Sequence, residues 1–192
     1  MKINMNNLYV LLISLFLILS ATFYIYAHMD IYENAERGDI LMINIIHFFN
    51  KTFVDMPYKS GLVPMHYAAI GGHVDVIEHL LKWGHSIDIY DNYYHTPMHS
   101  AAAYNNTMFV VKLLEKGSQS INIVDAFNCT PVHYMLEYNN VDELIKYIEN
   151  INVENSVSTL LINNIHHIHN NLNYTICKIP IYKFNFKVPF NV

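Results

Sequence analysis

The chain has 192 residues, of which 53% are hydrophobic and 14% are charged, and its formal net charge is -5. This hydrophobic content is enough for one compact domain with additional segments, and it excludes a wholly disordered chain. The acidic balance and the lack of any basic run in the sequence argue against a nucleic-acid-binding protein, which needs positive charge to contact phosphates.

An apolar segment occupies the N-terminus. Residues 8–27 carry no charged side chain, and as an α-helix they would be roughly 30 Å long, the thickness of the hydrocarbon core of a bilayer. Residues 1–28 are therefore predicted to form a transmembrane or signal segment. A single-pass N-terminal anchor is favoured over a cleaved secretory signal, since a signal has a shorter apolar region and small residues before its cleavage site. A buried helix of a soluble domain is the remaining alternative.

The rest of the chain contains an internal repeat. Pro64 begins the segment PMHYAAIGGHVDVIEHLLKWG, which recurs 33 residues later, from Pro97, as PMHSAAAYNNTMFVVKLLEKG. A third copy, PVHYMLEYNNVDELIKYI, begins at Pro131, and AERGDILMINII from Ala35 matches only the later half of the unit. Similarity at a fixed period of this length predicts a repeat architecture, in which each unit buries its apolar face against its neighbours.

The period and the residues of these copies resemble the ankyrin repeat, whose pattern is G-x-T-P-L-H-x-A-A-x-x-G-H followed by an apolar helix that ends near a glycine. The resemblance covers roughly residues 35–148. It implies an all-α ankyrin-repeat solenoid of helix-turn-helix units with β-turn tips. The predicted segments after the N-terminal one are a degenerate capping repeat (29–60), two repeats (61–93 and 94–127), a degenerate repeat (128–157), and a C-terminal cap helix with an extended tail (158–192).

Two local features of the repeats predict their energetics. Thr96 and Thr130 precede the helix-starting prolines, where a threonine hydroxyl can accept an amide proton of the first helical turn and contribute about 1 kcal/mol. Val63 occupies this position in the preceding copy, whose helix is expected to fray more. Tyr94 stands where the family has a turn glycine, and a left-handed backbone there would cost on the order of 1 kcal/mol.

The resemblance also implies where a partner would bind, because ankyrin proteins usually contact partners through the turn tips and the first helices. By register, the candidate contact residues are Asn92, Tyr93, His95, Tyr104, Ala126, Phe127, Glu137 and Tyr138, with Lys59, Ser60, Leu62, Ile70, Ala103 and Cys129 at neighbouring positions. The aromatic members are expected to act as interface anchors, because they offer a large apolar area with few rotatable bonds.

The predicted function is a non-enzymatic scaffold for protein–protein interaction, attached to a membrane through residues 8–27 or secreted. Short ankyrin proteins of this composition resemble those of intracellular bacteria, parasites and large DNA viruses, in which such modules engage host proteins. The sequence has no glycine-rich phosphate loop and no G-x-S-x-G motif, so no cofactor, small-molecule substrate or catalytic residue is expected.

Two alternatives remain open. The chain could be a structural membrane-protein subunit that is braced by its repeats. It could also bind a metal through the histidine-rich tail, since His166 and His169 would share one face of a helix and Cys177 could add a third ligand. A structural zinc site needs about four ligands, so the tail supplies an incomplete set.

Overall fold

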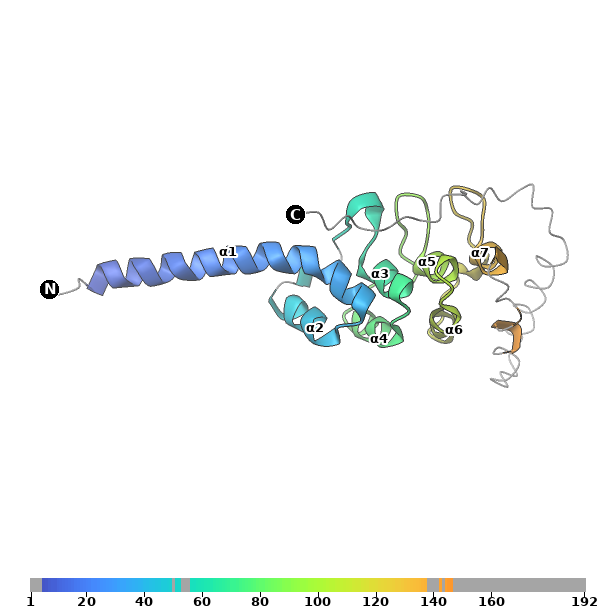
Figure 1. Ribbon diagram of the computed structural model, residues 1–192, viewed down its shortest axis with the longest axis horizontal. Helices are drawn as coiled ribbons and strands as arrows, with labels where there is room; N and C mark the ends of the chain where they lie inside the picture. Colours follow the sequence, from blue (N-terminus) through green and yellow to red (C-terminus); the bar gives the residue numbers. More distant parts are fainter. Residues whose placement is uncertain (1–4, 50, 53–55, 138–141, 143, 147–192) are drawn as a thin grey trace.

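The computed structural model describes residues 5–49, 51–52, 56–137, 142 and 144–146 (Figure 1). The described part contains helices and turns and no strand, which confirms the predicted all-helical class. The predicted cap helix and tail (158–192) and most of the last repeat lie outside the described residues. The helices are α1 (Met5–Arg37), α2 (Ile40–Phe49), α3 (Pro64–Gly71), α4 (Val74–Lys82), α5 (Pro97–Ala103), α6 (Thr107–Glu115) and α7 (Pro131–Glu137), with short 3₁₀ turns η2 (Lys59–Gly61) and η3 (Ser120–Asn122).

The longest helix, α1, contains residues of both the predicted N-terminal segment and the predicted first repeat. Its described N-terminal side chains, from Tyr9 to Phe23, are almost all exposed, whereas Ile31, Tyr32 and Ala35 near its C-terminal end are buried. The expected boundary at residue 28 therefore lies inside one helix, and the first helix of the first repeat continues the apolar segment. Among the described residues, no helix combines the length and the apolar character that crossing a membrane requires.

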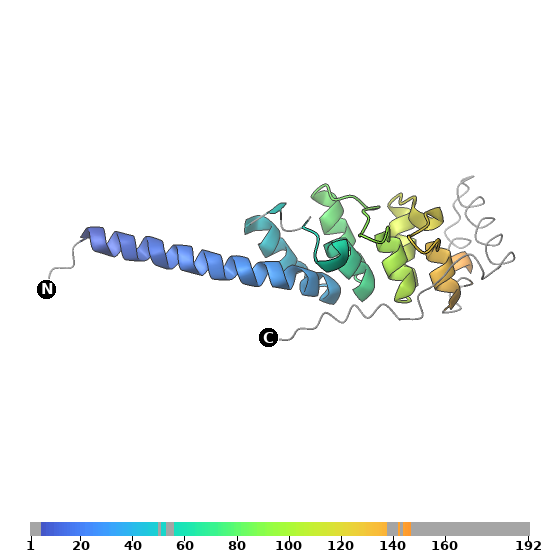
Figure 2. The ribbon, with the colours of Figure 1, turned by 90° about the horizontal axis from the view of Figure 1, so that it is seen from above.

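The remaining helices stack in two rows beside each other. The inner row runs α1, α3, α5, α7 and the outer row runs α2, α4, α6, and consecutive members of each row are in contact. The stack extends away from the projecting N-terminal part of α1 (Figures 1 and 2). This arrangement is a solenoid, in which each helix pair is covered by the next.

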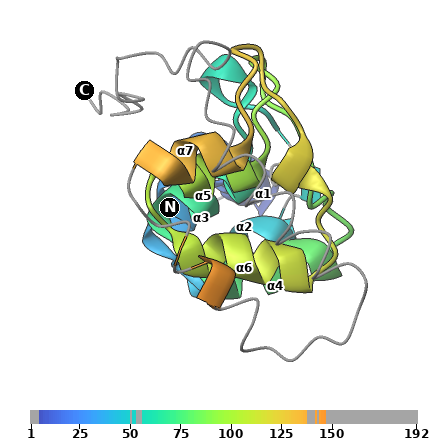
Figure 3. The same ribbon diagram turned by 90° about the vertical axis from the view of Figure 1, so that its right-hand side faces the viewer.

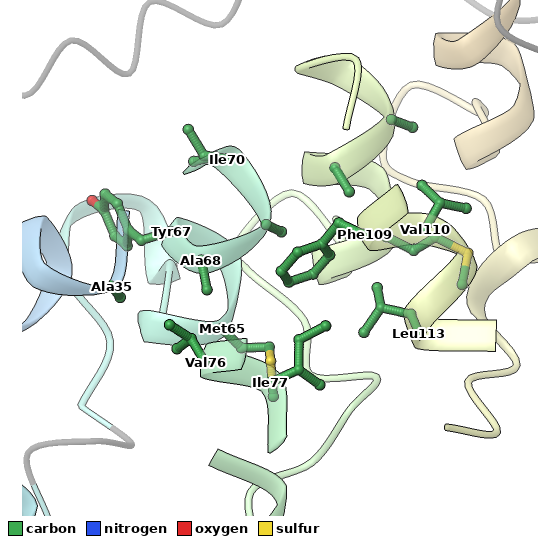
Figure 4. Packing of buried hydrophobic residues seen from close by; sticks show 14 of the residues in the cluster. Ala35, Met65, Tyr67, Ala68, Ile70, Val76, Ile77, Phe109, Val110 and Leu113 are labelled. Atoms are coloured by element: carbon green, nitrogen blue, oxygen red, sulfur yellow. The ribbon is translucent and has the colours of Figure 1, made fainter. Parts of the chain in front are cut away.

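Small residues in the inner row let its helices approach closely. Ala68, Ala69, Ala101 and Ala102 are at most 1% exposed, and Gly71 ends α3 so near α1 that an added Cβ would lie 1.9 Å from the Glu36 carbonyl oxygen. Larger side chains fill the space between the rows (Figure 4). Burial of these apolar groups on both sides of each repeat is what stabilises the stack. The interior seen in Figure 4 includes Met65, Val76, Ile77, Phe109 and Leu113.

At the start of α5 the capping prediction missed the part played by a histidine, the third residue after Thr96. The Thr96 hydroxyl makes no cap bond to the first amides of α5; it lies 2.9 Å from His99 Nδ1. The histidine provides the cap instead, since His99 Nδ1 accepts the Thr96 amide proton at 3.1 Å. His66 Nδ1 accepts the Val63 amide proton in the same way at 3.2 Å. Val63 stands where the other copies have threonine, and this difference therefore removes no hydrogen bond to a main-chain amide.

Candidate functional site

Three loops connect the helix pairs and project side by side from one edge of the stack (Figures 1 and 3). We name them the first tip (58–63), the second tip (91–96) and the third tip (125–130). They are the β-turns that the resemblance predicts, and they carry most of the expected contact residues. Their shape decides which side chains a partner could reach.

Aspartates shape the second and third tips. Asp91 Oδ1 accepts the amide protons of Tyr93 and His95, both at 2.8 Å. Asp125 Oδ1 accepts those of Phe127 and Cys129, at 2.8 and 2.9 Å. A short acidic side chain that bonds the backbone two and four residues later fixes the turn. These internal hydrogen bonds therefore fix the shape of both tips in the absence of a partner.

Main-chain hydrogen bonds join neighbouring tips. Asn92 N donates to Ser60 O at 2.9 Å, and Ala126 N donates to Tyr93 O at 2.9 Å. Each tip is thus tied to the previous one by its backbone as well as by the helices beneath. The three tips form a surface of fixed spacing.

Left-handed residues close the turns. Tyr94 has φ +62° and Asn128 has φ +61°. Asparagine tolerates this region, but a tyrosine side chain is strained there. Tyr94 therefore has the left-handed backbone, and the expected strain is present in the second tip. Tyr94 is 63% exposed, and its ring meets the edge of the Tyr90 ring at a centroid distance of 6.4 Å.

A buried charge links the second tip to the third. His95 Nδ1 donates to Asp91 Oδ2 at 2.9 Å, and His95 Nε2 lies 3.3 Å from Asp125 Oδ2. Tyr134 of α7 donates its hydroxyl proton to the same Asp125 oxygen at 2.6 Å. All four side chains are buried. A protonated imidazole between two carboxylates compensates charges that would otherwise be costly inside the protein.

The surroundings of this cluster shift its pKa values in the direction that keeps it charged. Burial opposes the charged form of His95, but the hydrogen bonds and charges of Asp125 and Asp91 outweigh burial and raise its pKa to about 9. Burial likewise opposes the charged form of Asp125, yet the bonds from His95, Tyr134 and the backbone hold its pKa at about 2. At neutral pH the His95 ring is therefore a cation and the Asp125 carboxylate is an anion.

The repeated histidines beneath the tips, unlike His95, have lowered pKa values. Burial lowers the pKa of His99 to about 4 and also lowers the pKa of His66. His99 Nε2 lies 3.2 Å from Cys129 O, and His66 Nε2 lies 3.1 Å from His95 O. Since each Nδ1 accepts an amide proton, the neutral ring must carry its proton on Nε2 and donate it to the next tip. These histidines are structural links between successive repeats.

The expected contact residues divide into exposed and buried sets. Asn92 and Ala126 are exposed, Tyr93 is 44% exposed, and Phe127 and Tyr104 are half-buried. Tyr93 and Phe127 stack on adjacent tips with ring centroids 6.2 Å apart. Glu137 lies in α7, but its side chain is outside the described part of the chain, and Tyr138 lies outside the described residues altogether.

The placement of His95 on the exposed face was wrong, because its side chain is only 3% exposed and holds the charge cluster. The neighbouring positions Leu62, Ile70 and Cys129 are also buried. The register from the family locates a tip but does not say which of its residues points inward. The sequence contained one signal of the cluster, since Asp91 and Asp125 occupy the same register of successive copies and His95 follows the first by four residues.

The metal hypothesis concerns His166, His167, His169 and Cys177, which lie outside the described residues. Within the part of the chain that the structure describes, no group of three His, Cys, Asp or Glu side chains is arranged to hold a metal ion. Of the histidines in this part, His66, His95 and His99 make the contacts described above.

Comparison with protein families identifies the class of the fold. A model of ankyrin repeats, in three copies, matches residues 31–125. The match begins in the C-terminal part of α1 and includes the degenerate first copy. The chain belongs to the ankyrin-repeat family, whose members are typically scaffolds for protein–protein interaction. A search of curated proteins gives no match.

Proposed function

We propose that this ankyrin-repeat protein is a membrane-attached, non-enzymatic scaffold that binds a partner protein on the exposed surface of its second and third tips. The observation that carries the proposal is the stacked pair of Tyr93 and Phe127 on two tips of fixed spacing. Aromatic residues at interfaces combine large contact area with few rotatable bonds, and they often dominate binding energy.

Preorganisation favours this surface as a binding site. The Tyr93 carbonyl accepts the Ala126 amide proton, and the buried charge cluster holds the two tips together from below. A partner would therefore lose little free energy in ordering the surface it binds. Asn92 and Ala126 directly precede the two aromatic residues and are exposed, and their small side chains leave the pair accessible.

The N-terminal part of α1 supports membrane attachment. Its apolar side chains between Tyr9 and Phe23 are exposed on all sides of the helix. A helix that is apolar all round requires burial in a protein core or in lipid. The hydroxyls of Ser14, Ser20 and Thr22 donate to carbonyls three or four residues earlier. Their polarity is thus satisfied within the helix, as a lipid environment demands.

Affinity capture with the full chain tests the binding surface. The double substitution Tyr93→Ala and Phe127→Ala should reduce recovery of the proteins captured by the parent chain by about 30-fold, as for loss of a hot spot of about 2 kcal/mol. The control replaces Met108 and Val124 by Ala; these residues are 54% and 48% exposed and lie outside the three tips, and the control should capture as the parent does. Equal recovery by the tip variant and the control would show that the partner binds elsewhere.

Alkaline extraction of membranes tests the attachment. Leu15→Arg with Ile18→Arg places two charges in the apolar run, and each costs about 3 kcal/mol in a membrane. This variant should appear in the soluble fraction, whereas the same charges at Met108 and Val124 should leave the chain in the membrane pellet. N-terminal sequencing of the parent chain from the pellet and from the soluble fraction distinguishes an anchor from a secreted form that has lost residues 1–28.

A further inference from the structure

Thr107 differs from its counterparts in the other repeats. It is the first residue of α6, as Ile40 is of α2 and Val74 is of α4, and the last copy has Val141 at this register. Ile40 and Val74 are partly buried and pack against the core. The position thus has an apolar role in the solenoid, and Thr107 adds a hydroxyl to it.

This hydroxyl is buried without a hydrogen-bond partner. Thr107 is 6% exposed, and its Oγ1 makes no hydrogen bond within the described part of the chain. It does not cap the helix either, because Asn106 is the N-cap residue of α6. A buried hydroxyl without a partner is destabilising, whereas a valine of the same shape carries no such cost. Packing and capping therefore do not account for the threonine.

Thr107 completes the sequence Asn-x-Thr that begins at Asn105. Asn-x-Thr is the acceptor sequence for N-linked glycosylation, in which the glycan is attached to the asparagine. Asn105 is exposed in the turn between α5 and α6, with φ +64°. A left-handed backbone suits an asparagine, but it does not require a threonine two residues later. The acceptor sequence accounts for both residues.

Three further Asn-x-Thr sequences begin at Asn50, Asn128 and Asn173. Asn50 and Asn173 lie outside the described residues. At Asn128 the repeat itself accounts for the threonine, because Thr130 precedes a helix-starting proline and its Oγ1 lies 2.8 Å from a histidine nitrogen of α7. Asn105 therefore differs from Asn128, since the fold gives no reason for its threonine.

The charges that flank the apolar run favour one orientation in a membrane. Lys2 precedes the run, and the first Lys or Arg after it is Arg37. The Arg37 guanidinium pairs with Glu33 one helical turn earlier, so its charge is compensated. Positive charge tends to remain on the cytosolic side of a membrane. Lys2 therefore indicates that the residues before the run stay in the cytosol and that the repeats lie on the lumenal side.

We propose that α1 places the repeats on the lumenal side of the membrane and that Asn105 carries an N-linked glycan there. The inference rests on the membrane attachment proposed above and adds an orientation and a modification site to it. The amide nitrogen of Asn105 forms a bond to C1 of an oligosaccharide that is carried by a lipid diphosphate. The bond from C1 to the diphosphate oxygen breaks, the lipid diphosphate leaves, and the amide loses one proton.

The transfer precedes the packing of α6, because Thr107 is buried in the folded chain and is then out of reach of the transferase. The glycan extends from the end of α5 that is remote from the second tip. The seven residues of this helix, Pro97–Ala103, rise by about 10 Å between the tip and the turn that holds Asn105. Tyr93 on the tip therefore stays accessible to a partner.

Translation of the full chain in the presence of endoplasmic-reticulum microsomes tests the site. An amidase that removes N-glycans leaves aspartate at each glycosylated asparagine, and peptide mass spectrometry measures this conversion at position 105. Samples without the amidase control for spontaneous deamidation. The parent chain and Thr107→Ser, which keeps the acceptor sequence, should be converted. Thr107→Val should show no conversion at this position.

Thermal unfolding shows whether the fold uses the hydroxyl. The full chain is made without microsomes, and hence without glycan, and is reconstituted in phosphatidylcholine vesicles. Thr107→Val should melt about 4 °C above the parent, because it removes the buried hydroxyl that has no partner. An equal or lower melting temperature would show that the fold uses the hydroxyl, and it would overturn the inference.

The remaining outcomes separate the two proposals. Unconverted Asn105 in a chain that resists alkaline extraction overturns the modification and leaves membrane attachment in place. Digestion of the repeats by a protease added outside sealed microsomes has the same meaning. Converted Asn105 in a chain that alkaline extraction releases supports the modification and overturns the anchor. A chain that stays outside the microsomes and is not converted overturns both.

Discussion

The first and second tips share one main-chain hydrogen bond but have opposite chemistry inside. In each, the first amide donates to the carbonyl four residues later, from Tyr58 to Leu62 at 2.8 Å and from Asp91 to His95 at 2.9 Å. Leu62 and His95 occupy the same register, and both are buried. Main-chain bonds thus set the turn, while the buried side chains decide whether successive repeats are joined by apolar packing or by charge.

The largest effect should follow from giving the second tip the residue of the first. His95→Leu leaves the Asp91 and Asp125 carboxylates buried without the cation between them, and it should lower the free energy of unfolding by about 3–5 kcal/mol. Urea unfolding at neutral pH measures the change. His79→Leu is the control, because that ring bonds only within its own helix, 3.0 Å from Asp75 O. A loss below about 1 kcal/mol for His95→Leu would contradict the role of the charge cluster.

The loss of stability at alkaline pH should come from the second tip, since the first contains neither Asp nor His. The pKa of His95 is about 9 in the folded chain, above the unfolded value of about 6.5. Its contribution is fully present below pH about 6.5 and is lost as the pH rises to about 9, a decrease of about 3 kcal/mol. The pKa of His99, about 4 when folded, makes stability fall in the other direction, as the pH drops from about 6.5 towards 4.

The free energy of unfolding, measured in urea from acid to alkaline pH, should therefore be greatest near pH 6.5, the unfolded pKa of histidine. In the His95→Leu variant the decrease on the alkaline side should disappear, while the decrease on the acid side, which includes His99, should remain. An alkaline decrease of the same size in this variant would show that another group causes it.

A smaller loss should follow from Tyr134→Phe, which tests whether the third tip depends on α7. The variant removes the hydroxyl that donates to Asp125 at 2.6 Å, and a hydrogen bond to a charged group is worth about 2 kcal/mol. Tyr90→Phe is the matched control, because Tyr90 is 48% exposed on the surface. Equal thermal unfolding of both variants would show that the bond adds nothing to stability.

The smallest effect should be a gain. Tyr94→Gly gives the second tip the glycine that the first has at Gly61, and both positions have positive φ, +62° and +80°. Relief of the left-handed strain should stabilise the chain by about 1 kcal/mol. Tyr90→Gly, at a position without positive φ, should give no gain. A lower melting temperature for Tyr94→Gly would mean that contacts of the tyrosine ring outweigh the strain.

The repeated part of the fold could be predicted from the sequence because its signals are local and recur. Pro64, Pro97 and Pro131 mark the helix starts, and the paired alanines mark where helices approach. The continuity of α1 could not be predicted in this way. The apolar run and the first repeat have different compositions, and no residue type between Ala27 and Ile31 either requires or forbids a break in the helix.

The site was predicted only in outline. The register placed Tyr93 and Phe127 on adjacent tips, but their stacking depends on the spacing that the repeats impose. The burial of His95 could not be predicted from its position, because it depends on Asp125, which is 30 residues later in the chain. The threonines suggested hydroxyl caps, whereas the cap bond at α5 comes from His99, three residues after Thr96.

The unbroken helix α1 fixes a direction as well as a position. A helix turns by about 100° and rises by about 1.5 Å with each residue. One residue inserted between Ala27 and Ile31 would therefore swing the whole row of tips about 100° around α1 while displacing it by only about 1.5 Å. The direction in which the tips face therefore depends on the number of residues in α1.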